Sequence, residues 1–158
     1  SATKKVEIRR FDRETVTGFL FLVNFLRPAG IEYLTPQGEL ATVPLNDVRV
    51  IFFVRDFTGK EAETEESRVF LTRPKTAGLW IHVEFRDGEV LEGILPNDLL
   101  SVEAAGFTIT PPGSGNYQRA FIPRSAIRRA QVLGVIGSPL KRVKKKPKAE
   151  QAALFEGQ

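Results

Sequence analysis

The chain has 158 residues, of which 42% are hydrophobic, so it is long enough for one medium domain or two small ones. It contains no cysteine and one histidine, His82, which excludes disulfides, thiolate catalysis and metal clusters built from cysteines or several histidines. Residues 141–158 hold six basic and two acidic side chains, so they account for the whole net charge of +4.

No apolar run approaches the roughly 18 residues of a membrane span, and residues 1–10 lack the apolar core of a signal peptide. We therefore expect a cytoplasmic protein without a membrane partner.

Residues 1–58 contain short segments with the two-residue period of β-strands, beginning with "VEIRRFDRETVTGFL" at 6–20. "GIEYLTP" at 30–36 and "VPLNDVRVIFFV" at 43–54 continue the pattern. Five short strands in so few residues predict a small closed barrel. The stretch "IFFVRDF" at 51–57 is apolar on both faces, so we expect it to be buried between two packed units.

Residues 59–78 interrupt the strand pattern with an acidic stretch that is typical of a solvated linker. Within them, "RVFLTRP" has an apolar centre at Val69, Phe70 and Leu71. We expect this centre to form a strand that bridges or caps a barrel.

Residues 79–138 repeat the pattern of the first segment. Val6 aligns with Ile81, Gly18 with Gly93 and, further on, Val48 with Ile127. Because the matches keep the same order, they indicate an internal duplication and a second five-stranded barrel. Its strands are expected around the turn at 86–89, in "GFTIT" at 106–110, in "RAFIP" and in "AIRRAQVLGVIG".

Each copy has an expected hairpin after its first strand. In the second copy, Asp87-Gly88 predicts a two-residue turn with positive φ. In the first copy "RFDRE" takes this place, so a looser hairpin is expected there.

The second copy, "VEFRDGEVLEGIL…GFTIT…FIPRSAIRRAQVLG", resembles the Sm-like fold, and the tandem arrangement resembles an uncharacterised bacterial family of paired small barrels. The predicted fold class is therefore all-β, with two tandem Sm-like or SH3-like barrels and a basic tail at 139–158. The resemblance implies RNA contacts from barrel loops, carried here by Asn97, Asp98, Arg128 and Arg129. Since the loop lacks an aromatic residue and the family's Arg-Gly pair is missing, RNA binding through these loops is the alternative prediction.

Catalytic groups are few. A lone His82 in an alternating strand predicts a surface histidine, and Asp12 and Asp87 are expected to form turns. The aromatic residues Phe70, Trp80 and Tyr117 are expected in the core or at the joint rather than in a cation-binding cage. We therefore predict a protein that is not an enzyme and has no metal or cofactor.

The segment "KRVKKKPK" has the composition of an extended chain that contacts phosphates in a salt-sensitive, sequence-independent way. The alternative is a solubilising tail. The cations expected to bind nucleic acid are Lys141, Arg142, Lys144, Lys145, Lys146 and Lys148.

The stretch "QAALF" resembles the short peptide by which bacterial replication and repair proteins dock on the DNA sliding clamp. The resemblance implies that Gln151 makes polar contacts at the pocket rim and that Leu154 and Phe155 fill an apolar groove. Ala152 and Ala153 depart from the preferred pattern, which implies modest affinity. The alternative is a helical turn that folds back onto a barrel.

Together these features predict an adaptor in nucleic-acid transactions. Deletion of residues 141–158 would separate it from a protein that binds RNA through its barrel loops, because only the adaptor would lose binding. A third possibility is a ligand-sensing barrel without nucleic acid. The ligand of the barrels, the choice between DNA and RNA, and the oligomeric state stay open.

Overall fold

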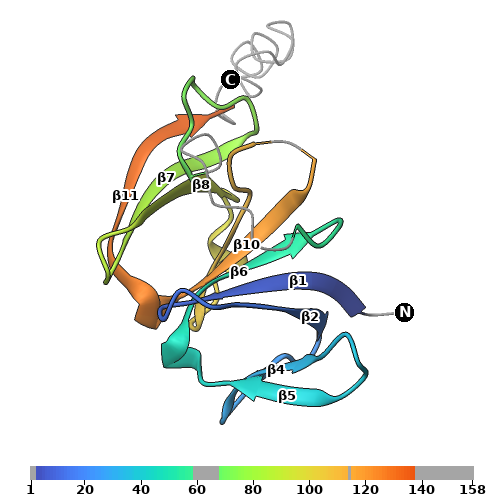
Figure 1. The fold of residues 1–158 in the computed structure, drawn as a ribbon. Helices are drawn as coiled ribbons and strands as arrows, with labels where there is room; N and C mark the ends of the chain where they lie inside the picture. Colours follow the sequence, from blue (N-terminus) through green and yellow to red (C-terminus); the bar gives the residue numbers. More distant parts are fainter. Residues whose placement is uncertain (1–2, 59–67, 114, 138–158) are drawn as a thin grey trace, which may run out of the picture.

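A computed structural model describes residues 3–58, 68–113 and 115–137, and these form an all-β protein with three short 3₁₀ helices (Figure 1). Within these ranges, no helix has the length and apolar character needed to cross a membrane. The first half contains β1 (Thr3–Arg10), β2 (Thr15–Phe21), β3 (Leu26–Arg27), β4 (Gly30–Leu34), β5 (Leu40–Val43), η1 (Leu45–Asp47) and β6 (Val48–Val54). The second half contains β7 (Gly78–Phe85), β8 (Val90–Leu95), η2 (Leu99–Ser101), β9 (Gly106–Ile109), β10 (Tyr117–Pro123), η3 (Arg124–Ala126) and β11 (Ile127–Ile136).

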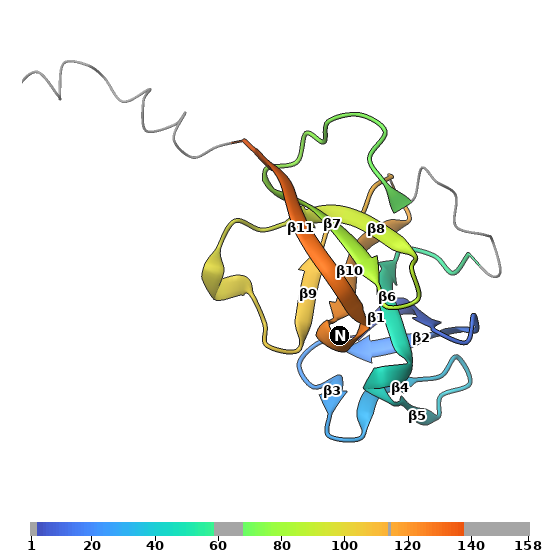
Figure 2. The same ribbon diagram turned by 90° about the vertical axis from the view of Figure 1, so that its left-hand side faces the viewer.

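The strands form two curled sheets. The larger sheet has the order β3-β4-β2-β1-β6-β10-β9, with β5 paired to β4, and the smaller sheet has the order β11-β7-β8. Strand β6 lies between β1 of its own half and β10 of the second half, and both pairings are antiparallel. Figures 1 and 2 show this joint at the centre of the molecule. The two halves therefore share one continuous sheet.

Pairing within the two halves follows the positions that the sequence aligns. Val6 lies opposite Gly18 in the β1–β2 pair, and Ile81 lies opposite Gly93 in the β7–β8 pair. The last strand of each half returns to the first, because β6 pairs with β1 and β11 pairs with β7. In each of these two pairs the register shifts near the start of the last strand, β6 or β11.

The first hairpin of each half has the same turn. The side chains of Asp12 and Asp87 each accept a hydrogen bond from the backbone N–H two residues on, so their expected role as turn formers is confirmed. Gly88 has the predicted positive φ, but Asp87 does not, so the prediction of a two-residue turn was wrong. In the first hairpin Arg13 takes the position of Gly88, with a φ of 74°. Both hairpins are closed by the same backbone hydrogen bonds, so the prediction that the first is looser was wrong.

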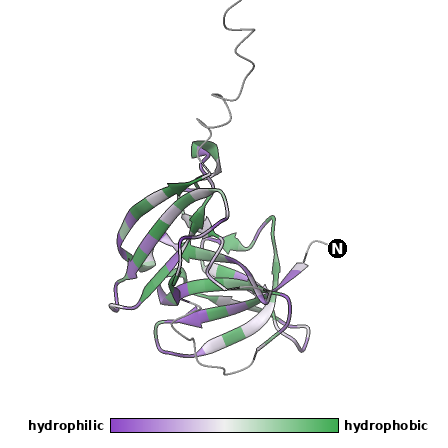
Figure 3. Cartoon of the chain, turned by 90° about the horizontal axis from the view of Figure 1, so that it is seen from above, coloured by the Kyte–Doolittle hydropathy of each residue, from purple (hydrophilic) through white to green (hydrophobic). Residues whose placement is uncertain are grey.

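Two hydrophobic cores meet at β6. Its Val50, Phe52 and Val54 pack into the core of the second half, whereas Ile51 and Phe53 pack against that of the first. Opposite faces of one strand thus serve two cores, as the two-residue period dictates. Val48 also packs in the first core, beyond the register shift between β1 and β6. Figure 3 shows the alternation of apolar and polar residues along the strands. The predicted burial is confirmed for Ile51, Phe52 and Val54, whereas Phe53 is half-buried and residues 55–57 lie beyond the strand and are exposed.

The segment around Phe70 is not the strand that its apolar residues predicted. Residues 69–71 are irregular, and the N–H of Phe70 donates to the Glu92 side chain at 3.2 Å rather than to a strand edge. The ring of Phe70 packs edge-on against Trp80, with centroids 6.2 Å apart. Leu71 remains 64% exposed. The apolar residues therefore cover an outer face of the β7–β8 pair without extending a sheet.

Candidate binding groove at the joint

The four predicted barrel-loop residues do not form one site. Asn97 and Asp98 follow the end of β8, where Leu95 lies opposite Leu79, whereas Arg129 lies opposite Glu84. Leu79 and Glu84 are five residues apart on β7, which corresponds to roughly 16 Å along a strand.

Two of these loop residues also have internal partners. The Asp98 carboxylate accepts hydrogen bonds from the Leu100 N–H and the Ser101 hydroxyl, both at 3.0 Å, and so caps η2. Arg128 donates to Glu84 at 3.0 Å and to the carbonyl of Arg86 at 2.6 Å. A ligand would have to replace these contacts in order to use either side chain.

His82 belongs to a polar cluster on the outer face of the smaller sheet. Its Nδ1 lies 2.8 Å from Glu92 Oε2, and Trp80 Nε1 donates to Glu92 Oε1 at 3.0 Å. The His82 side chain is 31% exposed, in agreement with the expected surface position. No group of three or more acidic, histidine or cysteine side chains suited to a metal ion occurs in the parts of the chain that the structure describes.

The predicted docking peptide and the tail cations lie outside the described residues. They comprise Gln151, Leu154, Phe155, Lys141, Arg142, Lys144, Lys145, Lys146 and Lys148.

A groove of about 500 Å³ crosses the joint between the two halves. Its first-half wall comes from β1, β6 and the loop after β2, and its second-half wall comes from β9, β10 and the loop before β9. The volume lies in the usual range for ligand-binding clefts. The lining residues are Lys4, Leu22, Phe25, Phe53, Glu103, Thr108, Gln118, Arg119 and Phe121.

Aromatic residues form the apolar part of this joint groove. Phe121 is 1% exposed and meets Phe25 edge to face, with ring centroids 5.7 Å apart. Phe53 is half-buried on β6, where it lies opposite Arg119. Strand pairing between the halves therefore sets the positions of Phe53 and Phe121.

The joint groove also has charged side chains at its edge. Lys4 and Arg119 are exposed and make no ion pair with any residue in the described ranges, and Glu103 is exposed beside them. Two cations around an apolar, aromatic cleft suit a ligand that combines an anionic group with a flat or apolar one.

A buried polar network holds the joint on the opposite face of the sheet. Glu7 is fully buried and accepts a hydrogen bond from Arg9 at 3.2 Å and from the N–H of Thr58 at 2.7 Å. Arg9 also donates to the hydroxyl of Tyr117 on β10 at 3.2 Å. Tyr117 packs on Phe52, with ring centroids 4.9 Å apart, so its expected place at the joint is confirmed. These contacts tie β1 and β6 to β10.

Sequence reasoning missed both the groove and this network. Glu7 and Arg9 are two residues apart in a strand and so share a face, which was the available signal for a buried ion pair. Lys4 and Arg119 come from different halves, and no local motif connects them.

The family comparison covers most of this structure. The matching family model spans residues 2–134 and is described as a family of unknown function (DUF6982). The chain belongs to this family. The DUF6982 match includes both halves and the joint groove, and residues 135–158 lie beyond it. The predicted membership of an uncharacterised family is confirmed. No curated protein and no solved structure gives a match.

Proposed function

We propose that this DUF6982 protein is a non-enzymatic adaptor in nucleic-acid transactions, built from two Sm-like barrels and a basic docking segment. The lysines of 141–148 contact phosphates, and the "QAALF" peptide docks on a partner such as the DNA sliding clamp. The joint groove supplies the second interaction of the adaptor.

The completeness of the second half without the tail carries this proposal. Strand β11 pairs with β7 over Ile127–Ile136, just as β6 pairs with β1 in the first half. Both halves thus return to their first strand before residue 137. Residues 138–158 follow in the sequence, and they contain six cations and an apolar Leu-Phe pair that a docking and phosphate-binding role would use.

A peptide experiment tests the docking part directly. A labelled peptide covering residues 144–158 is titrated with a bacterial sliding clamp, and fluorescence anisotropy is recorded. Saturable binding in the micromolar range is expected, because a short peptide loses conformational entropy when it docks. The matched control carries Leu154→Ala and Phe155→Ala and should not bind. Equal binding by both peptides, or none by either, would reject the docking role.

The joint groove favours a second candidate, an Sm-like protein that binds RNA through its body. Lys4 and Arg119 could hold phosphates while a base stacks in the aromatic cleft. Two variants of the full chain separate the candidates in anisotropy measurements with a single-stranded RNA at several salt concentrations. One carries Lys144→Gln, Lys145→Gln and Lys146→Gln, and the other carries Lys4→Gln and Arg119→Gln.

The tail variant should lose most of its RNA affinity if the protein is the proposed adaptor, and its dependence on salt should weaken. Loss confined to the groove variant would replace the adaptor with the RNA-binding candidate. An unmodified chain that shows no salt-dependent binding would reject both and favour a ligand-sensing barrel.

A further inference from the structure

Several strands have a partner strand on one side only in the described parts of the chain. Among them are β11, which pairs with β7, and β5, which pairs with β4. By contrast, β6 has a strand on each side, β1 and β10. An open edge presents unpaired N–H and C=O groups that can add a further strand.

The two open edges correspond to the two strands that form the joint. Strand β11 corresponds to β6, because Ala130 lies opposite Val83 just as Ile51 lies opposite Ile8. Strand β5 corresponds to β10, since both pair with the preceding strand and lead through a proline into a 3₁₀ helix. The chain thus contains the two surfaces of this joint twice, and within one copy only one set is engaged.

The exposure of β11 contrasts with that of its counterpart. Every residue of β6 except Phe53 is buried, whereas Ile136 is the only buried residue of β11. Val132 is 58% exposed, Leu133 46% and Val135 45%. Residues 130–136 carry no charge, so this part of the edge lacks the lysines or other charges that usually prevent pairing.

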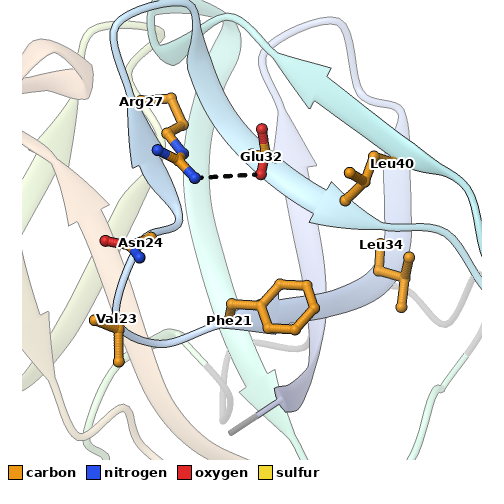
Figure 4. Close-up of a pocket in the computed structure, with 7 residues that line it drawn as sticks. All are labelled: Phe21, Val23, Asn24, Arg27, Glu32, Leu34 and Leu40. Atoms are coloured by element: carbon orange, nitrogen blue, oxygen red, sulfur yellow. Dashed lines mark ion pairs between the residues drawn. The ribbon is translucent and has the colours of Figure 1, made fainter.

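An apolar groove runs from the loop after β2, across β4, to Leu40 on β5 (Figure 4). It measures about 490 Å³ and is lined by Phe21, Val23, Leu34 and Leu40, with an Arg27–Glu32 ion pair at 3.8 Å beside them. We call it the β5 groove. Leu40 is 64% exposed and Val23 81% exposed. Apolar side chains this exposed are typical of a surface that is covered by a partner.

The β5 groove corresponds to the second-half wall of the joint groove, because Glu32 and Leu40 take the strand positions of Thr108 and Arg119. At the joint, the loop after β2 brings Phe25 against Phe121. The corresponding loop after β8 carries Leu99 and Leu100, which are 87% and 96% exposed. A second copy of the chain would therefore bring these leucines to the β5 groove.

We propose that copies of the chain associate head to tail, with β11 of one copy pairing antiparallel to β5 of the next. The joint sets the register: Phe121 lies opposite Ile51, and Arg119 lies opposite Phe53. The corresponding pairs between copies are Thr42 with Ala130 and Leu40 with Val132. Such a contact joins two different surfaces, so it produces a closed ring if the rotation closes and an open chain otherwise. This association is independent of the adaptor role.

The mass of the full chain in solution tests the association. Light scattering after size exclusion should give at least twice the 17.6 kDa of one chain across a concentration series. Leu40→Arg and Val132→Arg should each reduce the mass to that of a monomer. Leu71→Arg is the matched control, because Leu71 is also 64% exposed but lies on neither surface, and its mass should not change. Circular dichroism checks that each variant is folded.

Mixing the two variants separates this geometry from a symmetric contact. Leu40→Arg keeps an intact β11, and Val132→Arg keeps an intact β5, so an equimolar mixture should form a dimer that grows no further. A symmetric β11–β11 contact would instead leave the Leu40→Arg variant associated and the mixture without this dimer. That result, or a monomeric unmodified chain, would overturn the proposal and leave the edge to residues 138–158 or to a different protein.

Because the chain has no cysteine, crosslinking offers a second readout that does not require a folded arginine variant. A chain with Leu40→Cys and Val132→Cys should oxidise to covalently linked copies. A chain with Leu71→Cys and Val132→Cys should stay largely unlinked. Equal crosslinking of the two chains would contradict the proposed register.

Discussion

Phe121 connects the two halves directly, because its backbone is part of the second half and its side chain packs in the core of the first. It lies on β10 of the second half, yet it packs in the first-half core with Val6, Ile8 and Ile51. Replacing it with alanine removes a 1% exposed ring and leaves a cavity in that core. Truncation of a buried phenylalanine costs about 3–5 kcal/mol of unfolding free energy. The edge-to-face contact with Phe25 is part of what is lost.

The assay is urea unfolding of the Phe121→Ala variant, followed by circular dichroism for both halves and by fluorescence of Trp80 for the second. With a denaturant slope of about 2 kcal/mol per M, the midpoint should fall by roughly 2 M. Both signals should fall together, because the halves share β6 and unfold as one unit.

The matched control is Phe57→Ala, in which the same ring is lost from a site that is 36% exposed, and it should cost about 1 kcal/mol or less. A Phe121→Ala loss below about 1 kcal/mol would refute the packing argument. Separate transitions, with Trp80 fluorescence unchanged, would show that the halves are independent.

Two further substitutions test the joint and the strand packing by the same unfolding assay. Glu7→Gln replaces the fully buried carboxylate that accepts from Arg9 and from the N–H of Thr58 with a neutral amide, and it should cost about 1.5–3 kcal/mol because hydrogen bonds to a charged group are lost; a loss below about 1 kcal/mol would contradict this. Gly106→Ala places a Cβ against the backbone carbonyl of Ile122 and should cost roughly 1–3 kcal/mol. Gly134→Ala is its control, since there the Cβ would meet Trp80 at an ordinary 3.7 Å, and equal losses would refute the steric argument.

Local patterns in the sequence were enough to predict most of the strands. Alternation predicts a strand because one face of a sheet is buried, and Pro123 and Gly88 mark breaks and turns that these residues favour. The hairpin at Arg13 was misjudged because a non-glycine residue adopts positive φ there. The apolar residues 69–71 were misjudged because apolar character alone does not supply a strand edge to pair with.

The joint groove could not be predicted in the same way. It depends on the pairing of β6 with β10, which lie far apart in the sequence, and a residue period does not specify pairing partners. Lys4 and Arg119 are ordinary surface cations when each half is taken alone. Only the contact between the halves brings them to one cleft beside Phe25.

The central claim is that one chain links a protein partner to a nucleic acid. The most direct test is a sedimentation experiment with a fluorescent single-stranded oligonucleotide, a sliding clamp carrying a second fluorophore, and the full chain. We expect the oligonucleotide to sediment with the clamp only when the chain is present, and Leu154→Ala with Phe155→Ala to abolish this. If the oligonucleotide never sediments with the clamp, or does so equally with the variant, the adaptor function is wrong.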